Sequence, residues 1–123
     1  MIVALLIACT AVDGDTIRCG AERIRITAID APEMPGHCRK GRDCAPGDPF
    51  ASKQAMAGYL ASGPLTVERL GMDRYGRTVA DVYSNGTSLS CLQLASGHAR
   101  YWPRYDNGGR IKLECGFIQE GNR

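Results

Sequence analysis

Hydrophobic and polar residues alternate most regularly between Glu22 and Ile29 (ERIRITAI). A period of two is typical of a β-strand that is buried on one face, and it places Arg25, Thr27 and Ile29 on the same side of the strand. Four other segments combine apolar residues with turn-forming boundaries and are also predicted to be strands: residues 1–12, 16–19, 65–70 and 78–83. The pattern therefore predicts five strands.

A helical segment is predicted to begin at Asp48 and Pro49. Aspartate accepts hydrogen bonds from the free N–H groups of a first helical turn, and proline fits the first helical position. We expect this helix over residues 49–61, and shorter helices over residues 88–96 and 110–117. The side chains of the long helix that are available for burial are Phe50, Ala55, Met56, Tyr59 and Leu60.

The whole chain, residues 1–123, is predicted to form a single domain, because it contains no linker, repeat or low-complexity stretch. Its composition, 44% hydrophobic and 23% charged, is that of a folded globular protein. Five strands with two or three helices indicate a β-rich α+β fold that is compatible with a Greek-key barrel. The apolar residues 1–11 are too short to span a bilayer and are either the first strand, which we favour, or the remnant of an export signal.

Six cysteines in a chain of this length are unusually many, and their number is even. In an oxidising compartment they would form disulfides, so we expect a secreted or periplasmic protein, with a cytoplasmic one not excluded. A hairpin that turns at Gly14 would bring Cys9 close to Cys19, and a loop could be closed by Cys38 and Cys44. Cys91 and Cys115 would then pair with each other because they remain. Fifteen connectivities exist in principle, and a zinc site from His37, Cys38 and Cys44 is a rival interpretation that lacks a fourth ligand.

The formal net charge of +2 is too small to indicate a polyanionic partner by itself. Of the 15 basic residues, 12 are arginines, whose planar guanidinium groups suit bidentate contacts with phosphate. An arginine-rich genome explains the same count, so the positions of the arginines decide the question.

Polar residues that suit chemistry gather in three clusters: Asp13-Gly14-Asp15-Thr16, Arg25 to Glu33, and Asp73 to Arg77. Each cluster has a structural interpretation, as a tight turn, an exposed strand end or a charged surface turn. Taken together they supply carboxylates, a rigid carbonyl before Glu33, and arginines. Oxygen ligands suit calcium, a further carboxylate can activate water, and arginines can neutralise charge on a phosphate. This combination predicts metal-assisted hydrolysis of a phosphodiester.

The chain contains the motifs DGDT, RIRITAIDAPE and DRYGRTVA. In their order and spacing, these motifs resemble those of the staphylococcal nuclease (thermonuclease) family. The resemblance runs from about Val12 to Tyr105. It implies a five-stranded OB-fold barrel and a calcium-dependent nuclease. Such an enzyme hydrolyses phosphodiester bonds of DNA or RNA and leaves 3′-phosphate ends.

The resemblance also implies a role for each matching residue of the metal centre. Asp15 and Asp30 would hold Ca²⁺ through their carboxylates and Ala31 through its backbone carbonyl, with Asp13 beside the metal. Glu33 matches the catalytic residue that positions or activates the attacking water. Many family members have threonine where this chain has Ala31, but a backbone oxygen serves equally well from alanine.

The residues that would contact the substrate follow in the same way. Arg25 and Arg77 match the two catalytic arginines that grip the phosphate. Arg74 and Tyr75 fall where the family contacts a terminal phosphate, and Tyr105 aligns with an aromatic residue of the base pocket.

The chain departs from the family pattern near the base pocket, where Pro103 replaces a tyrosine and Trp102 is a potential substitute for stacking. Two other functional classes remain as alternatives. One is a non-catalytic OB-fold module that binds single-stranded nucleic acid. The other is a disulfide- or zinc-stabilised interaction domain. We expect a monomer with a DNA or RNA substrate and no membrane-spanning segment.

Overall fold

The computed structural model describes residues 2–4 and 8–117, with side chains from residue 8 onward. The described strands are β1 (Ile2–Ala4), β2 (Cys9–Ala11), β3 (Thr16–Cys19), β4 (Glu22–Ile26), β5 (Ile29–Asp30), β6 (Leu65–Met72), β7 (Thr78–Ser84), β8 (Thr87–Ser88) and β9 (Arg100–Tyr101). The helices are α1 (Pro49–Ala61), α2 (Leu89–Ala95) and α3 (Arg110–Cys115), and two 3₁₀ turns, η1 (Pro103–Tyr105) and η2 (Asn107–Gly109), precede α3. The predicted α+β, β-rich class with three helices is confirmed.

The main sheet is rolled but open. Its strand order is β1-β6-β7-β4-β3-β2, with β8 attached to β7, and β4 and β7 pair in parallel while the other neighbours are antiparallel. The outermost strands β1 and β2 are consecutive among the described strands of the chain. This arrangement is consistent with an OB-type fold, and the described strands do not close a hydrogen-bonded barrel.

The strand predicted over residues 22–29 is interrupted at Thr27 and Ala28. Ala28 adopts a left-handed conformation with φ of 64°, which is rare for a residue other than glycine. The register changes at this point, so the prediction that Arg25, Thr27 and Ile29 share one face is wrong. Thr27 and Ile29 are buried, whereas Arg25 is half-buried. The break places Ile29 and Asp30 in a separate two-stranded sheet with β9.

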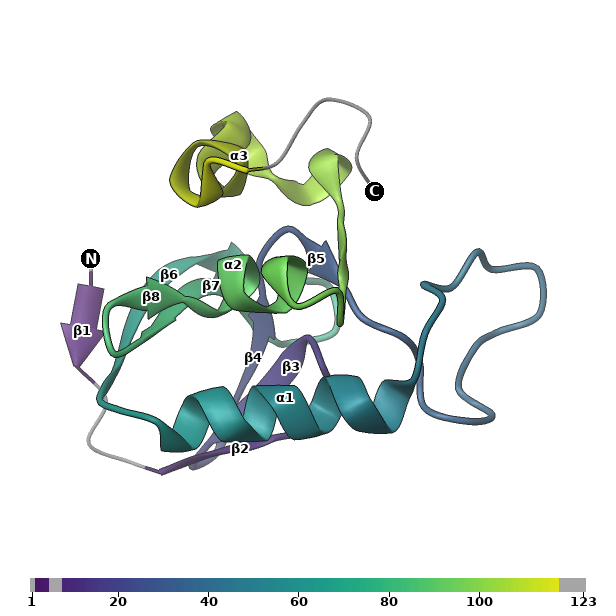
Figure 1. Ribbon diagram of the computed structural model, residues 1–123, viewed down its shortest axis with the longest axis horizontal. Helices are drawn as coiled ribbons and strands as arrows, with labels where there is room; N and C mark the ends of the chain where they lie inside the picture. The colour runs from purple at the N-terminus through teal and green to yellow at the C-terminus, as the bar shows by residue number, and fades with distance from the viewer. Residues whose placement is uncertain (1, 5–7, 118–123) are drawn as a thin grey trace.

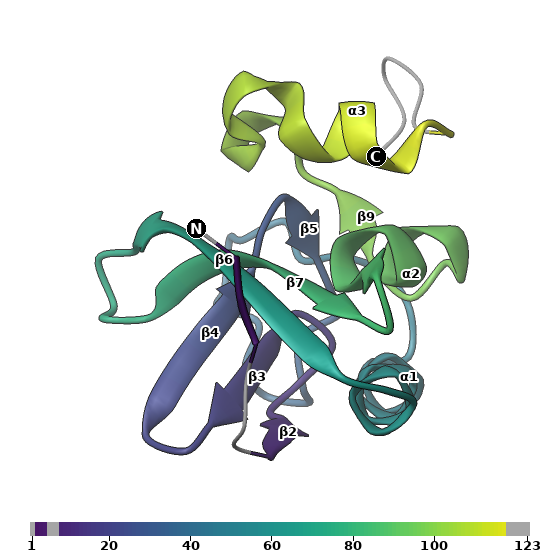
Figure 2. The ribbon, with the colours of Figure 1, turned by 90° about the vertical axis from the view of Figure 1, so that its left-hand side faces the viewer.

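The three helices are stacked along one side of the molecule, and α2 lies between α1 and α3 in both views (Figures 1 and 2). Helix α1 begins as predicted, because the Asp48 carboxylate accepts hydrogen bonds from the N–H groups of Phe50 and Ala51. Met56 and Leu60 of α1 are buried in the core, but the predicted burial of Phe50 is wrong, since its side chain is 61% exposed. Its place in the interior is taken by Ser52.

The main hydrophobic core lies between the concave face of the sheet and helices α1 and α2. Three isoleucines of β3, β4 and β5, namely Ile17, Ile24 and Ile29, have no exposed surface. The other core members are Cys19, Ile26, Met56, Leu60, Leu65, Val67, Ala80, Val82 and Leu89. Their burial fixes β5 against α1 and α2, and β5 carries Asp30.

Three disulfides join the pairs predicted from the sequence: Cys9–Cys19, Cys38–Cys44 and Cys91–Cys115. The first lies between directly opposed residues of β2 and β3, and the last joins α2 to α3. The second closes the long segment between β5 and α1, which extends away from the rest of the molecule in Figure 1. Because Cys38 and Cys44 are bonded to each other, the zinc site considered with His37 is excluded.

A buried polar contact fixes the turn between β2 and β3 against the helices. The amide of Gln93 in α2 donates hydrogen bonds to the carbonyl oxygens of Gly14 and Ser52, at 2.8 and 3.1 Å. The hydroxyl of Ser52 donates to the carbonyl of His98 at 2.7 Å. Gly14 fits here because it has no side chain: a Cβ atom at this position would overlap Ser52 Oγ and lie 2.8 Å from the Cβ of Ala31.

We predict opposite effects for two glycine-to-alanine substitutions. Gly14→Ala should lower the free energy of unfolding by about 1–3 kcal/mol, because the new methyl group overpacks against Ser52. Gly58→Ala, in helix α1 with open space around the position, should raise it by about 1 kcal/mol through helix propensity. Urea unfolding of both variants measures the two changes. Equal stabilities would show that Gly14 is not required by packing.

Candidate functional site

Two of the predicted metal ligands, Asp15 and Asp30, are both buried. Asp15 begins β3 after the Asp13-Gly14 turn, in which the Asp15 N–H donates to the carboxylate of Asp13 at 3.0 Å. The carboxylate of Asp15 accepts hydrogen bonds from the N–H of Ala31 at 2.9 Å and from the hydroxyl of Thr16 at 3.1 Å. The structure thus brings Asp15 against the peptide that joins Asp30 to Ala31.

Each of these two carboxylates is paired with an arginine. Arg25 Nη2 lies 3.4 Å from the carboxylate of Asp15, and Arg100 Nη2 lies 3.0 Å from that of Asp30. Burial would raise the pKa of Asp15, but Arg25 together with the surrounding hydrogen bonds outweighs this effect and holds the pKa below its usual value. The carboxylate of Asp15 is therefore an ionised acceptor in the folded protein, as a cation site requires.

The residues present fit a calcium ion by their chemistry. Asp15, Asp30 and the carbonyl of Ala31 supply hard oxygen atoms, the ligand type that Ca²⁺ prefers, and water would complete the shell. In the described part of the chain, no group of three His, Cys, Asp or Glu side chains converges to hold a metal. A cation at this position would accordingly rest on two carboxylates and a backbone oxygen.

Asp13 lies beside Asp15 in the same turn, and the two carboxyl groups differ in protonation. Burial, and after it the negative charge of Asp15, raises the pKa of Asp13 from 3.8 to about 7. Asp13 is therefore largely protonated below neutral pH, while Asp15 carries the negative charge. The two carboxyl groups share one turn with a single full charge, which limits their mutual repulsion.

Glu33, the predicted residue for activating water, is half-buried at the start of the long loop. Its carboxylate forms an ion pair of 3.2 Å with Arg42 of the same loop, and its side chain retains 24% of its exposure. Glu33 follows the ligand segment by two residues, and Pro32 between them is buried. The carboxylate is accordingly accessible to solvent beside the predicted metal ligands.

The turn between β6 and β7 presents the second predicted arginine. Asp73 accepts hydrogen bonds from the N–H of Arg77 at 2.9 Å and from its Nε at 2.7 Å. Among the described residues, the two terminal nitrogens of Arg77 have no hydrogen-bond partner. A fixed guanidinium with its outer nitrogens available is suited to holding a phosphate.

Arg74 and Tyr75 lie at the tip of the same turn and are exposed. The Arg74 guanidinium donates to the Tyr75 hydroxyl at 2.9 Å, and the Tyr75 ring faces both Arg74 and Arg77. The hydrogen bond from Arg74, and then the charges of Arg74, Arg39 and Arg42, lower the pKa of Tyr75. The hydroxyl of Tyr75 therefore lies in a positively charged environment.

Two aromatic residues complete this side of the site. Tyr105 in η1 is 50% exposed and packs edge-on against Trp102, with ring centroids 4.3 Å apart. The guanidinium of Arg25 lies 5.8 Å from the ring of Trp102. Trp102 thus connects the expected base-binding residue Tyr105 to the expected phosphate-binding residue Arg25.

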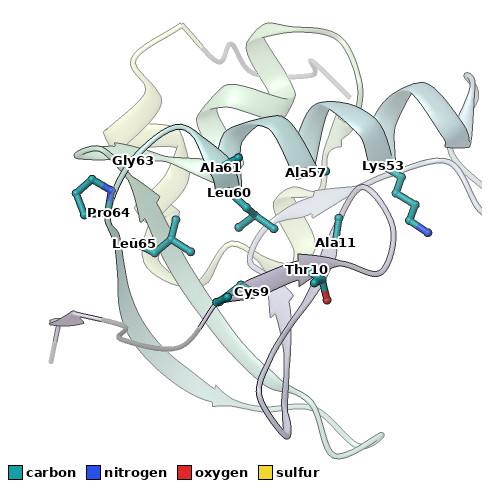
Figure 3. A pocket seen from close by; sticks show the side chains of 11 residues that line it. Cys9, Thr10, Ala11, Lys53, Ala57, Leu60, Ala61, Gly63, Pro64 and Leu65 are labelled. Atoms are coloured by element: carbon teal, nitrogen blue, oxygen red, sulfur yellow. The ribbon is translucent and has the colours of Figure 1, made fainter.

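A groove of about 690 Å³ lies elsewhere, between β2, the end of α1 and the start of β6 (Figure 3). Its lining includes Thr10, Lys53, Leu60 and Pro64 and none of the predicted site residues. The candidate site is therefore separate from this groove.

Sequence reasoning missed the charged partners of the predicted residues. Arg100 pairs with Asp30 although 70 residues separate them, because they are directly opposed on β5 and β9. Arg42 pairs with Glu33, and Gln93 supports the turn that precedes Asp15. The short strands β5 and β9 have two residues each, so no periodic pattern was available to predict their pairing.

The raised pKa of Asp13 predicts a pH dependence of stability for the metal-free protein. The stabilisation from protonating folded Asp13 is fully present below pH 3.8 and is lost as pH rises through about 7. Between pH 5.5 and 8 the free energy of unfolding of the wild type should fall by about 2 kcal/mol relative to that of Asp13→Asn, because the asparagine side chain does not titrate. Urea unfolding in chelator at several pH values measures this, and parallel curves for the two proteins would contradict it.

No helix among the described residues is long and apolar enough to cross a membrane.

Comparison with known proteins gives related sequences for most of the chain. The succinoglycan biosynthesis protein ExoI of Rhizobium meliloti (strain 1021) is 37% identical over 92 residues, which cover 72% of this chain and 47% of that protein. Two probable staphylococcal-like nucleases of Oryza sativa subsp. japonica are also similar. CAN1 is 32% identical with 76% of this chain and 25% of its own length covered, and CAN3 is 30% identical with 68% and 20% covered.

The chain spans about half or less of the length of these relatives. The family model described as staphylococcal nuclease homologue matches residues 23–114, which include the candidate residues from Arg25 to Tyr105 but not Asp13 and Asp15. The chain therefore belongs to the staphylococcal nuclease homologue family.

Proposed function

We propose that this protein is a calcium-dependent nuclease that hydrolyses phosphodiester bonds of DNA or RNA and leaves 3′-phosphate ends. The observation that carries the proposal is that the fold joins the segment of Asp15 to the segment that contains Asp30, Ala31 and Glu33. The hydrogen bond of 2.9 Å from Ala31 to Asp15 joins the two ligand segments. Family membership supports a nuclease, and the donor set supports calcium as the metal.

In the proposed reaction, one residue acts on the attacking water and two others bind the phosphate. Glu33 accepts a proton from the attacking water, whose oxygen forms a bond to phosphorus. The bond from phosphorus to the 5′-oxygen breaks, and this oxygen takes a proton from solvent. Arg25 and Arg77 hold the phosphate oxygens and neutralise the charge that develops on them. When bound, calcium would supply further stabilisation of this charge and bring water close to Glu33.

The substrate would lie across the turns that surround these residues. Arg74 and Tyr75 sit at the tip of the β6–β7 turn, and Tyr105 lies next to Trp102. Stacking of a base on an aromatic ring tolerates any base, so we infer little sequence preference. The three disulfides support an oxidising location, secreted or periplasmic, for this activity.

Substitution of Glu33 tests the assigned chemistry. Glu33→Gln should reduce the turnover of single-stranded DNA in calcium by about 100-fold or more, because the amide cannot accept the proton of water. The measurements are hydrolysis with calcium, hydrolysis with chelator, and mass spectrometry of the product ends. Thermal unfolding of the variant checks that the fold is unchanged.

Two results would overturn the proposal. Turnover of Glu33→Gln close to that of the wild type would remove Glu33 from the reaction. No cleavage by the wild type in calcium, together with measurable binding of single-stranded DNA, would favour a non-catalytic binding module.

Substitution of Arg77 tests the contact with the phosphate. Arg77→Lys should lower kcat by about 100-fold with a smaller change in KM, because the arginine contributes most when charge builds on the phosphate oxygens. Arg69→Lys is the matched control, since Arg69 also pairs with a carboxylate, Glu22, but belongs to neither the turn nor the loop. A similar kcat for both variants would show that Arg77 does not act on the transition state.

A further inference from the structure

Arg100 on β9 makes contacts that the predicted roles of the site residues leave unexplained. Its Nε and Nη2 both donate to one carboxylate oxygen of Asp30, at 3.1 and 3.0 Å. The same Nη2 donates to the backbone carbonyl of Asp43 at 2.8 Å, and Nη1 lies 3.5 Å from the Asp43 carboxylate. One guanidinium therefore joins a predicted metal ligand to the middle of the long loop.

The Asp43 segment is the point at which this loop is attached to the site. The preceding residue, Arg42, pairs with Glu33 at 3.2 Å, and the following residue, Cys44, is bonded to Cys38. Between residues 33 and 48 only Ala45 is buried, so the loop has little hydrophobic packing to hold it in place. Its position depends on polar contacts, and the strongest of them come from Arg100.

The ion pair between Arg100 and Asp30 is largely buried. The Asp30 side chain retains 4% of its exposure and that of Arg100 25%, so the pair is poorly screened by solvent. Arg100 occupies one oxygen of Asp30, and the other oxygen has no hydrogen-bond partner among the described residues. The carboxylate is thus held in one orientation with one oxygen still available to a cation.

We propose that Arg100 is a positioning residue that couples the long loop to the metal carboxylate. Its guanidinium fixes the carboxylate of Asp30 and, through the Asp43 carbonyl, the loop segment from which Arg42 reaches Glu33. The catalytic consequence of this coupling rests on the proposed function. The structural consequence, an ordered loop, does not depend on it.

Arg100→Lys separates the two contacts. A lysine has a single ammonium group, which can neutralise Asp30 but cannot reproduce the fork that also reaches the Asp43 carbonyl. Arg100→Ala removes both contacts and leaves Asp30 buried without a partner. Arg69→Ala is the matched control, because it removes a two-bond pair with Glu22 that is not connected to the loop.

Limited proteolysis with trypsin measures how readily the loop is cleaved, because Arg39, Lys40 and Arg42 are cleavage sites inside the Cys38–Cys44 ring. Cleavage there, measured after reduction of the disulfide, should be about tenfold faster in Arg100→Lys and Arg100→Ala than in the wild type and in Arg69→Ala. In calcium, Arg100→Lys should also lower kcat by about tenfold while KM changes less than twofold.

The outcomes separate this inference from the proposed function. Equal cleavage rates for the wild type and Arg100→Lys would overturn the coupling, whether or not the protein is a nuclease. Faster loop cleavage with unchanged kcat would overturn the positioning role. Faster loop cleavage in a protein that hydrolyses no nucleic acid would retain the structural coupling and reject the nuclease.

Discussion

The hydrogen bond from the Ala31 N–H to the Asp15 carboxylate is the interaction on which the candidate site depends. It joins the turn after β2 to the end of β5, and these two segments supply all of the proposed metal ligands. The bond is possible because Gly14 lets the turn approach both Ala31 and helix α1. The amide of Gln93 also donates to the Gly14 carbonyl, although the side-chain oxygen of Gln93 is buried without a hydrogen-bond partner among the described residues. A buried oxygen without a hydrogen bond costs about 1–3 kcal/mol of stability. The hydrogen bonds that the Gln93 amide donates to this turn offset that cost.

The charges of the site are arranged in pairs around this bond. Asp15 faces Arg25, Asp30 faces Arg100, Glu33 faces Arg42 and Asp73 faces Arg77. Buried carboxylates that lack a partner would be protonated or would destabilise the fold, and the arginines prevent both. The arginines also provide a positive surface for a phosphate without a large net charge on the protein, which explains why the formal charge of +2 carries so little information.

The local features of the site follow from the sequence, and the long-range ones do not. The Asp13-Gly14 turn, the start of α1 at Asp48 and the disulfide pairs were all predicted from neighbouring residues or simple symmetry. The break at Ala28 was not, because a left-handed alanine is imposed by the tertiary fold against its own preference. The same holds for Arg100, whose partner is set by the pairing of β5 with β9. Sequence motifs therefore predicted the candidate site residues, and the structure was needed to find the contacts that hold them.

The disulfides strengthen the parts of the molecule that the core does not reach. Cys91–Cys115 attaches α3, and the N–H groups of Ile111 and Lys112 in α3 donate hydrogen bonds to the carboxylate of Asp106. Cys38–Cys44 closes a loop in which almost every side chain is exposed. A covalent ring reduces the number of conformations of that loop but does not fix its position relative to the sheet. A contact from the sheet itself is required for that purpose, and Arg100 is the residue of β9 that makes it.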